Sequence, residues 1–133
     1  MPRLHVLAVA ARLPAWAEQA CADYARRMPR GYEVERLTVK DEARLAVPRG
    51  ARLVVLDERG RDLTTADFAQ LLGTPSAFVI GGAEGVSAGL KRKADLVLKL
   101  SSLTLPHALA QVVLLEQLYR AATLRTGHPY HRG

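Results

Sequence analysis

Residues 77–93 read AFVIGGAEGVSAGLKRK, and this stretch decides the class of fold. The apolar run Ala77–Ile80 predicts a buried strand, the glycine-rich turn Gly81–Gly85 follows at once, and Val86–Lys93 predicts a short helix. A strand that passes straight into a turn and a helix is the building unit of a parallel sheet covered by helices. We therefore expect strands and helices to alternate on both sides of this stretch.

The flanking segments alternate in the same way. Apolar and β-favouring runs predict further strands at Leu4–Ala10, Tyr32–Val39, Arg52–Asp57 and Leu96–Leu100. Apolar periodicity and capping signals predict helices over Ala15–Met28, from Thr64 or Thr65 to Leu72, and over Ala108–Arg125. Glu58–Asp62 is typical of a charged turn, and Lys40–Gly50 leaves room for one short helical turn. The sequence thus predicts a single α/β domain over residues 1–133, a mostly parallel sheet of about five to six strands with helices on both faces.

Composition excludes several classes of protein. The 133 residues fit one domain, and 49% are apolar, which is too many for a disordered chain. The single cysteine, Cys21, excludes a disulfide framework and a multi-cysteine metal site, and it favours a reducing, cytoplasmic environment. No apolar run approaches the ~18 residues of a membrane span, so we expect no membrane association. The net charge of +6 favours a polyanionic partner, although 5% aromatic residues argues against a base-stacking platform.

Three segments follow predicted strands and nominate a binding site. They are Asp57–Asp62, Gly81–Gly85 and Ser101–His107, and ligands of open parallel sheets bind beyond the carboxyl ends of the strands. The glycine turn matches neither the G-x-G-x-x-G pattern nor a phosphate-binding loop with its lysine. It fits either a tight structural turn or a ligand without phosphate that backbone groups hold.

The loop before the last helix has an unusual composition. Its hydroxyl groups and backbone amides could bind the polar edge of a heterocycle, and Leu103 and Leu105 could close over its faces. The alternative is a plain helix entry, in which Thr104 and His107 cap the backbone locally. The helix that follows is apolar nearly all round its first half, which predicts a second subunit against it unless another helix of the same chain covers it.

The end of the chain concentrates reactive groups. Residues 127–133 contain His128, Tyr130, His131 and Arg132, whose side chains serve proton transfer, stacking and phosphate pairing. The alternative is a solvated basic tail. The two histidines have a plausible zinc-ligand spacing, but no cysteine or further histidine supports a metal site, so we expect no metal.

Two short basic runs are candidate phosphate contacts. One is Lys91–Lys93, and the other combines Arg26 and Arg27 with Arg30. For each run the alternative is an ordinary solvated face, as is common for short stretches of charge.

Four motifs occur in a fixed order along the chain. They are G-G-x-E-G at Gly81–Gly85, L-T-L-P-H at Leu103–His107, E-Q-L-Y-R-A at Glu116–Ala121 and H-P-Y-H-R at His128–Arg132. In this combination the chain resembles the RlmH family, the large-subunit ribosomal RNA pseudouridine N3-methyltransferases of the SPOUT class. The likeness runs through the whole chain. The chain departs from the family between the second and third predicted strands, where Lys40–Gly50 is all that remains of a longer segment.

The resemblance implies an α/β domain with a C-terminal trefoil knot, a homodimer, and S-adenosylmethionine as the methyl donor. The substrate it implies is N3 of a pseudouridine in large-subunit ribosomal RNA, which we expect to be methylated within the assembled ribosome. The cofactor-binding residues it implies lie in or beside the three segments above: Leu56, Gly81, Leu100, Ser101, Ser102, Leu103, Thr104 and Leu105.

The methylated nitrogen carries a proton that must leave, so the reaction needs a base or a stabilised anion. His107, Tyr130 and His131 are the candidate groups for this proton, and Arg132 could stabilise an anion or bind a phosphate. Two other functions remain open. One is a non-catalytic RNA- or ribosome-binding factor that keeps the same fold. In such a protein we would expect the glycine turn or the loop Leu100–His107 to have lost its motif, and both motifs are intact. An interaction module that uses its last helix only to dimerise would leave the tail unexplained.

Overall fold

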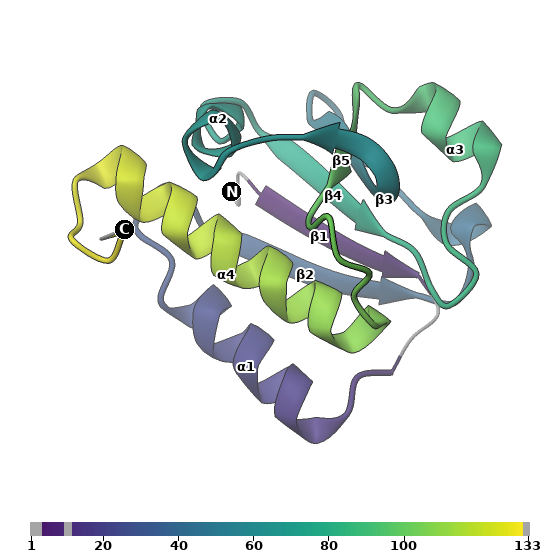
Figure 1. Ribbon diagram of the computed structural model, residues 1–133, viewed down its shortest axis with the longest axis horizontal. Coiled ribbons are helices and arrows are strands. Elements are labelled where there is room, and N and C mark those ends of the chain that lie inside the picture. Colours follow the sequence, from purple (N-terminus) through teal and green to yellow (C-terminus); the bar gives the residue numbers. More distant parts are fainter. Residues whose placement is uncertain (1–3, 10–11, 132–133) are drawn as a thin grey trace.

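The computed structural model describes residues 4–9 and 12–131, and its centre is a sheet of five parallel strands (Figure 1). The spatial order is β2-β1-β4-β3-β5. In chain order the strands are β1 (Leu4–Val9), β2 (Val34–Val39), β3 (Arg52–Asp62), β4 (Ser76–Ile80) and β5 (Leu96–Lys99). Every pairing is parallel. The predicted α/β class and parallel sheet are confirmed.

Helices cover both faces of the sheet, as predicted. One face packs against α1 (Ala15–Arg26), α2 (Thr65–Leu71) and α4 (His107–Thr126), through a core that joins Val54 and Phe78 to Cys21, Phe68 and Leu114. The other face is covered by α3 (Ala88–Lys93) and by the segment with the single helical turn η1 (Glu42–Arg44). None of the helices in the described ranges is long and apolar enough to cross a membrane.

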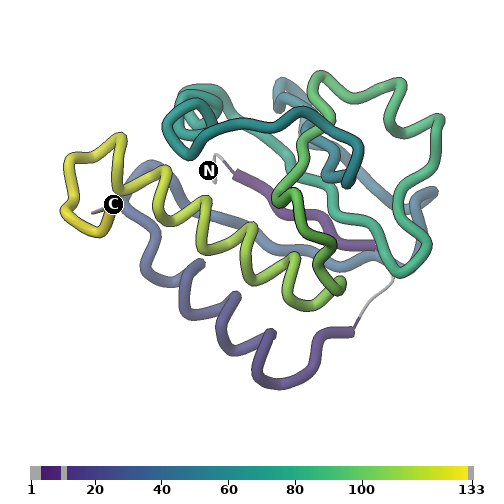
Figure 2. Tube along the Cα trace, viewed as in Figure 1, coloured from purple at the N-terminus to yellow at the C-terminus, as the bar shows by residue number. Residues whose placement is uncertain are grey.

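The longest helix, α4, lies between α1 and α2 and packs against both. Leu114, Leu115 and Leu118 on α4 are fully buried within the monomer. Helices of the same chain therefore cover much of the apolar surface for which the sequence analysis expected a second subunit. Near the start of α4, Leu109 remains 37% exposed. Figure 2 shows α1 and α4 running side by side in the same direction, which places Trp16, 56% exposed, at the same end of the helix pair.

One predicted turn is wrong, because Glu58–Asp62 continues strand β3. Leu56 and Arg61 both lie opposite Leu98 of β5, so residues 57–60 bulge out and the strand then returns to the same partner. Gly60 makes this return possible. A Cβ at Gly60 would stand 2.6 Å from the backbone of Leu98, so only a residue without a side chain fits there. The charged composition of this segment gave no signal for the long-range pairing. The trefoil knot stays a prediction.

The short segment between β2 and β3 is held by one acidic side chain. The Glu42 carboxylate accepts hydrogen bonds from the Ser87 backbone N–H at 2.8 Å and from the Ser87 hydroxyl at 2.6 Å. Ser87 also caps α3 by accepting from the Leu90 N–H. The segment thereby anchors the start of α3, the helix that follows the glycine turn.

Candidate active site

The three predicted loops meet at one edge of the sheet. A cavity of about 570 Å³ lies beyond the carboxyl ends of β3 and β4 and beside the start of α4, lined by residues 56–58, 80–86, 91, 104–107 and 110. A second pocket of about 130 Å³ adjoins it and is lined by residues 56–58, 100, 101, 103–105 and 110. Parallel strands bring their carboxyl ends to the same edge, which is why loops distant in sequence share this cavity.

Gly81–Gly85 is a closed turn. The Gly85 N–H donates to the Gly82 carbonyl oxygen at 2.9 Å, and Gly85 has a φ of 76°. A Cβ at Gly81 would stand 2.7 Å from the carbonyl carbon of Gly85. Glycine is needed at position 81 because the turn folds back on itself, so the structural role of the turn is confirmed. Its role in binding a cofactor stays a prediction.

The loop between β5 and α4 lies along the same cavity edge. The Ser101 hydroxyl accepts from the Leu103 N–H at 2.9 Å, which closes the loop locally, and Leu103 itself is 77% exposed. Of the residues expected to bind the cofactor, Ser102 alone lines neither cavity. Asp57 and Lys91 form an ion pair of 3.3 Å on the opposite wall.

His107 is the predicted catalytic residue that borders the cavity. It is the first residue of α4, and its Nε2 lies 2.9 Å from the Nε2 of the buried Gln111. An amide nitrogen can only donate, so His107 accepts at Nε2 and carries its proton on Nδ1 in the neutral form. Gln111 thereby selects one tautomer of this histidine.

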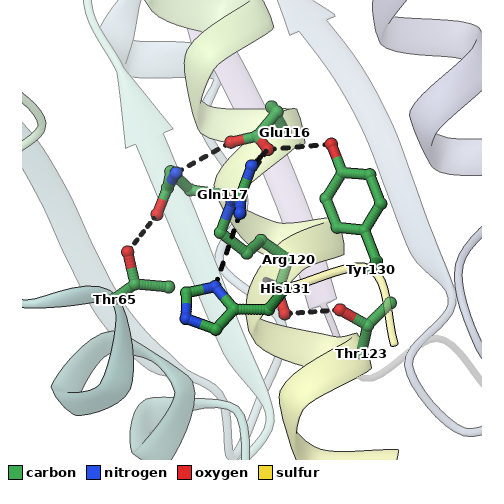
Figure 3. Close-up of polar contacts among 7 residues, drawn as sticks. All are labelled: Thr65, Glu116, Gln117, Arg120, Thr123, Tyr130 and His131. Atoms are coloured by element: carbon green, nitrogen blue, oxygen red, sulfur yellow. Dashed lines mark hydrogen bonds and ion pairs between the residues drawn. The ribbon is translucent and has the colours of Figure 1, made fainter. Parts of the chain in front are cut away.

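The middle of α4 carries a hydrogen-bond network around Glu116 (Figure 3). Its Oε2 accepts from Arg120 Nη2 at 2.7 Å, from Arg120 Nε at 3.0 Å and from the Tyr130 hydroxyl at 2.9 Å. Its Oε1 accepts from Gln117 at 2.7 Å, and Gln117 in turn accepts from the Thr65 hydroxyl at 2.9 Å. This network joins α2, α4 and the tail.

The tail therefore docks on the body of the protein through Tyr130 and His131, while residues 127–129 stay exposed. The Tyr130 ring meets the Tyr119 ring edge-on, with 4.6 Å between centroids. Arg120 also lies over the Tyr130 ring, with its guanidinium carbon 4.9 Å from that centroid. Burial, and the hydrogen bond to the Glu116 carboxylate, raise the pKa of Tyr130 far above its usual range. Its hydroxyl stays protonated and donates, so in this arrangement it is no base.

Arg120 also selects the tautomer of His131. Its Nη1 lies 3.4 Å from His131 Nδ1, and a guanidinium can only donate. The His131 proton in the neutral form therefore sits on Nε2, which leaves that nitrogen as a hydrogen-bond donor. Arg132, the fourth predicted catalytic residue, lies outside the described residues.

The structure separates the predicted catalytic residues instead of gathering them. His107 begins α4, whereas Tyr130 and His131 contact Glu116 and Arg120, 9 and 13 residues further along the helix, which is an axial separation of roughly 14–20 Å. Sequence reasoning assigned no role to Glu116, Gln117 or Arg120. The available signal was the spacing of Glu116 and Arg120, which places both on one side of a helix. In the part of the chain described, no group of three His, Cys, Asp or Glu side chains gathers as a metal site would require.

Comparison with known proteins places the chain in a family. The SPOUT methyltransferase family model matches residues 2–131. A Burkholderia mallei protein named "Ribosomal RNA large subunit methyltransferase H" is 44% identical, with 98% of this chain and 99% of that protein covered; a protein of the same name from Laribacter hongkongensis is 43% identical with the same coverage. The first of these alignments spans 154 positions, more than this chain has, so the relative carries residues that this chain lacks.

Solved structures of low identity share the fold. The SpoU methyltransferase AviRb from Streptomyces viridochromogenes, in complex with AdoMet, aligns with a TM-score of 0.58 and 19% identity, over 92% of this chain and 57% of that one. An RNA methyltransferase structure from Bacillus anthracis aligns with a TM-score of 0.60 and 15% identity, over 96% of both chains. With its parallel sheet, its loop-lined cavity and a family match over nearly its whole length, the chain belongs to the SPOUT methyltransferase family.

Proposed function

We propose that the protein transfers a methyl group from S-adenosylmethionine to N3 of a pseudouridine in large-subunit ribosomal RNA, within the assembled ribosome. One observation carries the proposal: the three loops that the sequence nominated surround a single cavity at the carboxyl edge of the sheet. The name shared by the relatives, which are 43–44% identical, supports the choice of RNA. The solved AviRb complex supports the choice of cofactor.

The residues of the cavity suit this cofactor. S-adenosylmethionine has no phosphate, and the walls lack a phosphate-binding motif. The cavity of about 570 Å³ is of the size that encloses small molecules, and the carboxylates of Asp57, Glu58 and Glu84 line it. Acidic groups complement the positively charged sulfur, from which the bound cofactor supplies its methyl group. The residues proposed to hold it are Leu56, Gly81 and the loop residues 100–105.

Methyl transfer breaks a carbon–sulfur bond, forms a carbon–nitrogen bond and releases the N3 proton. Each pKa unit between that proton and neutral pH costs about 1.4 kcal/mol. His107 borders the cavity and is the proposed acceptor of the proton, which requires its Nε2 to exchange the hydrogen bond from Gln111 for the N3 proton. His131, with its donor Nε2–H, is proposed to bind a carbonyl oxygen of the ring and to stabilise the anion.

These two histidines can act on one nucleotide only if a second subunit contributes. The α4 helix is rigid, and Arg120, which contacts His131, lies roughly 20 Å along it from His107. In a two-fold homodimer whose α4 helices run antiparallel, the tail of one subunit would lie beside the cavity of the other. The exposed Trp16, Leu109 and Leu103 lie at the cavity end of the molecule and would be covered in such a pair. We propose this homodimer as the active form.

Two measurements test the proposal. The first titrates the protein with S-adenosylmethionine in a calorimeter, and the second follows transfer of labelled methyl to ribosomes from a strain that lacks the modification. We expect micromolar or tighter cofactor binding and one methyl group per ribosome on a single pseudouridine. A non-catalytic ribosome-binding factor would bind the particle and transfer nothing, and that result would overturn the proposal.

A further inference from the structure

We propose that Arg27 binds a backbone phosphate of the substrate RNA, next to the nucleotide that the tail contacts. This inference rests on the proposed function, and it assigns an RNA-binding surface where the ends of α1 and α4 meet the tail. We call this surface the arginine–tyrosine surface, and it consists of Tyr24, Arg27, Tyr119 and Tyr130.

Arg27 is the residue directly after α1, and aromatic rings hold its side chain in place. Its guanidinium carbon lies 4.8 Å from the centroid of the Tyr119 ring and 5.5 Å from that of the Tyr24 ring. The same Tyr119 ring meets Tyr130 of the tail at 4.6 Å. The cation is thus fixed one ring away from the tail, while its residue remains exposed. Stacking on rings restricts the arginine and lowers the entropy that a later contact would cost.

The positive charge of Arg27 forms no ion pair with a described carboxylate, unlike the charges of two neighbouring arginines. Its neighbour Arg26 forms an ion pair with Asp23 at 2.6 Å, and Arg120 forms one with Glu116 at 2.7 Å. Across residues 4–9 and 12–131, by contrast, no carboxylate forms an ion pair with Arg27. The arginine–tyrosine surface therefore presents one ordered, unpaired cation beside the tail.

A phosphate fits this cation best. A guanidinium carries five N–H groups in a planar fork that can match two oxygens of a phosphate, and a hydrogen bond with Tyr119 raises the pKa of Arg27 and keeps it charged. The substrate is a polyanion that must approach the tail for the tail to act. Because phosphate contacts position an RNA without reading its sequence, Arg27 would set the register of the RNA relative to His131.

Binding of unmodified ribosomes at several KCl concentrations tests this assignment. Arg27→Met keeps a long side chain on the rings without the charge, and Arg27→Lys keeps the charge. Arg26→Met is the matched control, because it removes the adjacent, paired arginine. We expect Arg27→Met to weaken binding about fivefold to tenfold and to lower the slope of log K against log [KCl] by about 0.7–0.9. Arg27→Lys should restore most of the affinity, and Arg26→Met should stay within twofold of the wild type.

Three results would overturn the inference. If Arg27→Met binds as the wild type does, the arginine only supports the tyrosine rings. If Arg26→Met loses as much affinity, the effect is one of overall charge. If the loss disappears on protein-free large-subunit RNA, the anion is a carboxylate of a ribosomal protein. Failure of the proposed function is distinguishable: a wild type that binds ribosomes but transfers no methyl group still allows the Arg27 comparison.

Discussion

The two ends of α4 differ in how they are built. At the first end, backbone turns and loop side chains surround an open cavity, and Gln111 holds His107 from one side. From its middle onward, Glu116, Arg120 and Tyr130 are joined by short hydrogen bonds, and the adjoining pocket, lined by Thr65 and Gln117 among others, measures about 220 Å³. A ligand needs room and backbone groups, whereas reactive side chains need partners that fix their protons. The difference indicates that the first end of α4 binds the cofactor, and that the network further along the helix positions the side chains that act on the substrate.

Removing residues 130–133 should have the largest effect on activity, because it deletes the tail side chains that are proposed to act on the substrate. We expect methyl transfer to fall by about a hundredfold or more, since loss of a donor that stabilises the anion, here His131, costs on that order. Cofactor affinity, measured by calorimetry on the same sample, should stay within twofold. The matched control is Arg49→Ala, which changes charge on an exposed loop. Full activity of the truncated protein would contradict the division between the two ends.

Gly81→Ala should damage the binding end alone. Its Cβ would stand 2.7 Å from the backbone of Gly85, so the turn must shift away from its present position. We expect S-adenosylmethionine to bind about tenfold more weakly or worse, a loss of about 1.4 kcal/mol or more. Gly89→Ala is the control, because its Cβ would find its nearest atom at 3.9 Å within α3. Equal cofactor affinities for the two variants would show that the turn is no part of the site.

Leu109→Arg tests whether the cavity of one subunit and the tail of a second subunit form one site. Leu109 is 37% exposed, so arginine can be accommodated in the monomer but would oppose burial against a second copy. Sedimentation velocity should show monomers at concentrations where the wild type is dimeric, and activity should fall about tenfold or more while cofactor binding persists. The control is Leu37→Arg, at a position 50% exposed on β2. A monomeric but fully active wild type would exclude the two-subunit site.

The smallest effect concerns the proton of Tyr130. Because its pKa is raised in the folded protein, the native state keeps this proton at a pH where the unfolded state has lost it. The stability that this tyrosine contributes is therefore present below about pH 10 and declines as the pH rises beyond it. In a spectroscopic titration of tyrosinate, the wild type and Tyr130→Phe should show the same number of ionising tyrosines near pH 10 while both remain folded. An extra ionisation in the wild type near pH 10 would show that Tyr130 is not held by Glu116.

Much of the fold followed from short-range signals. The strand and glycine turn of residues 77–85 and the cap at Thr64, one of the two threonines proposed for it, are local features that the structure has where the sequence placed them. The extension of β3 was missed because Arg61 and Asp62 pair with residues far along the chain. Gly60 was visible in the sequence, but its need for close approach to β5 exists only after the two strands are side by side.

The sequence by itself determined which residue types the site contains, because ordered motifs and the carboxyl-edge rule depend on local spacing and strand direction. Only the tertiary structure decided where those residues lie relative to one another. It set His107 apart from Tyr130 and His131, since these two contact Glu116 and Arg120, 9 and 13 residues further along α4. It also gave Glu116 and Arg120 their partners, because the tail folds back onto the helix surface. Helix length is local, but which surfaces meet depends on packing of the whole chain.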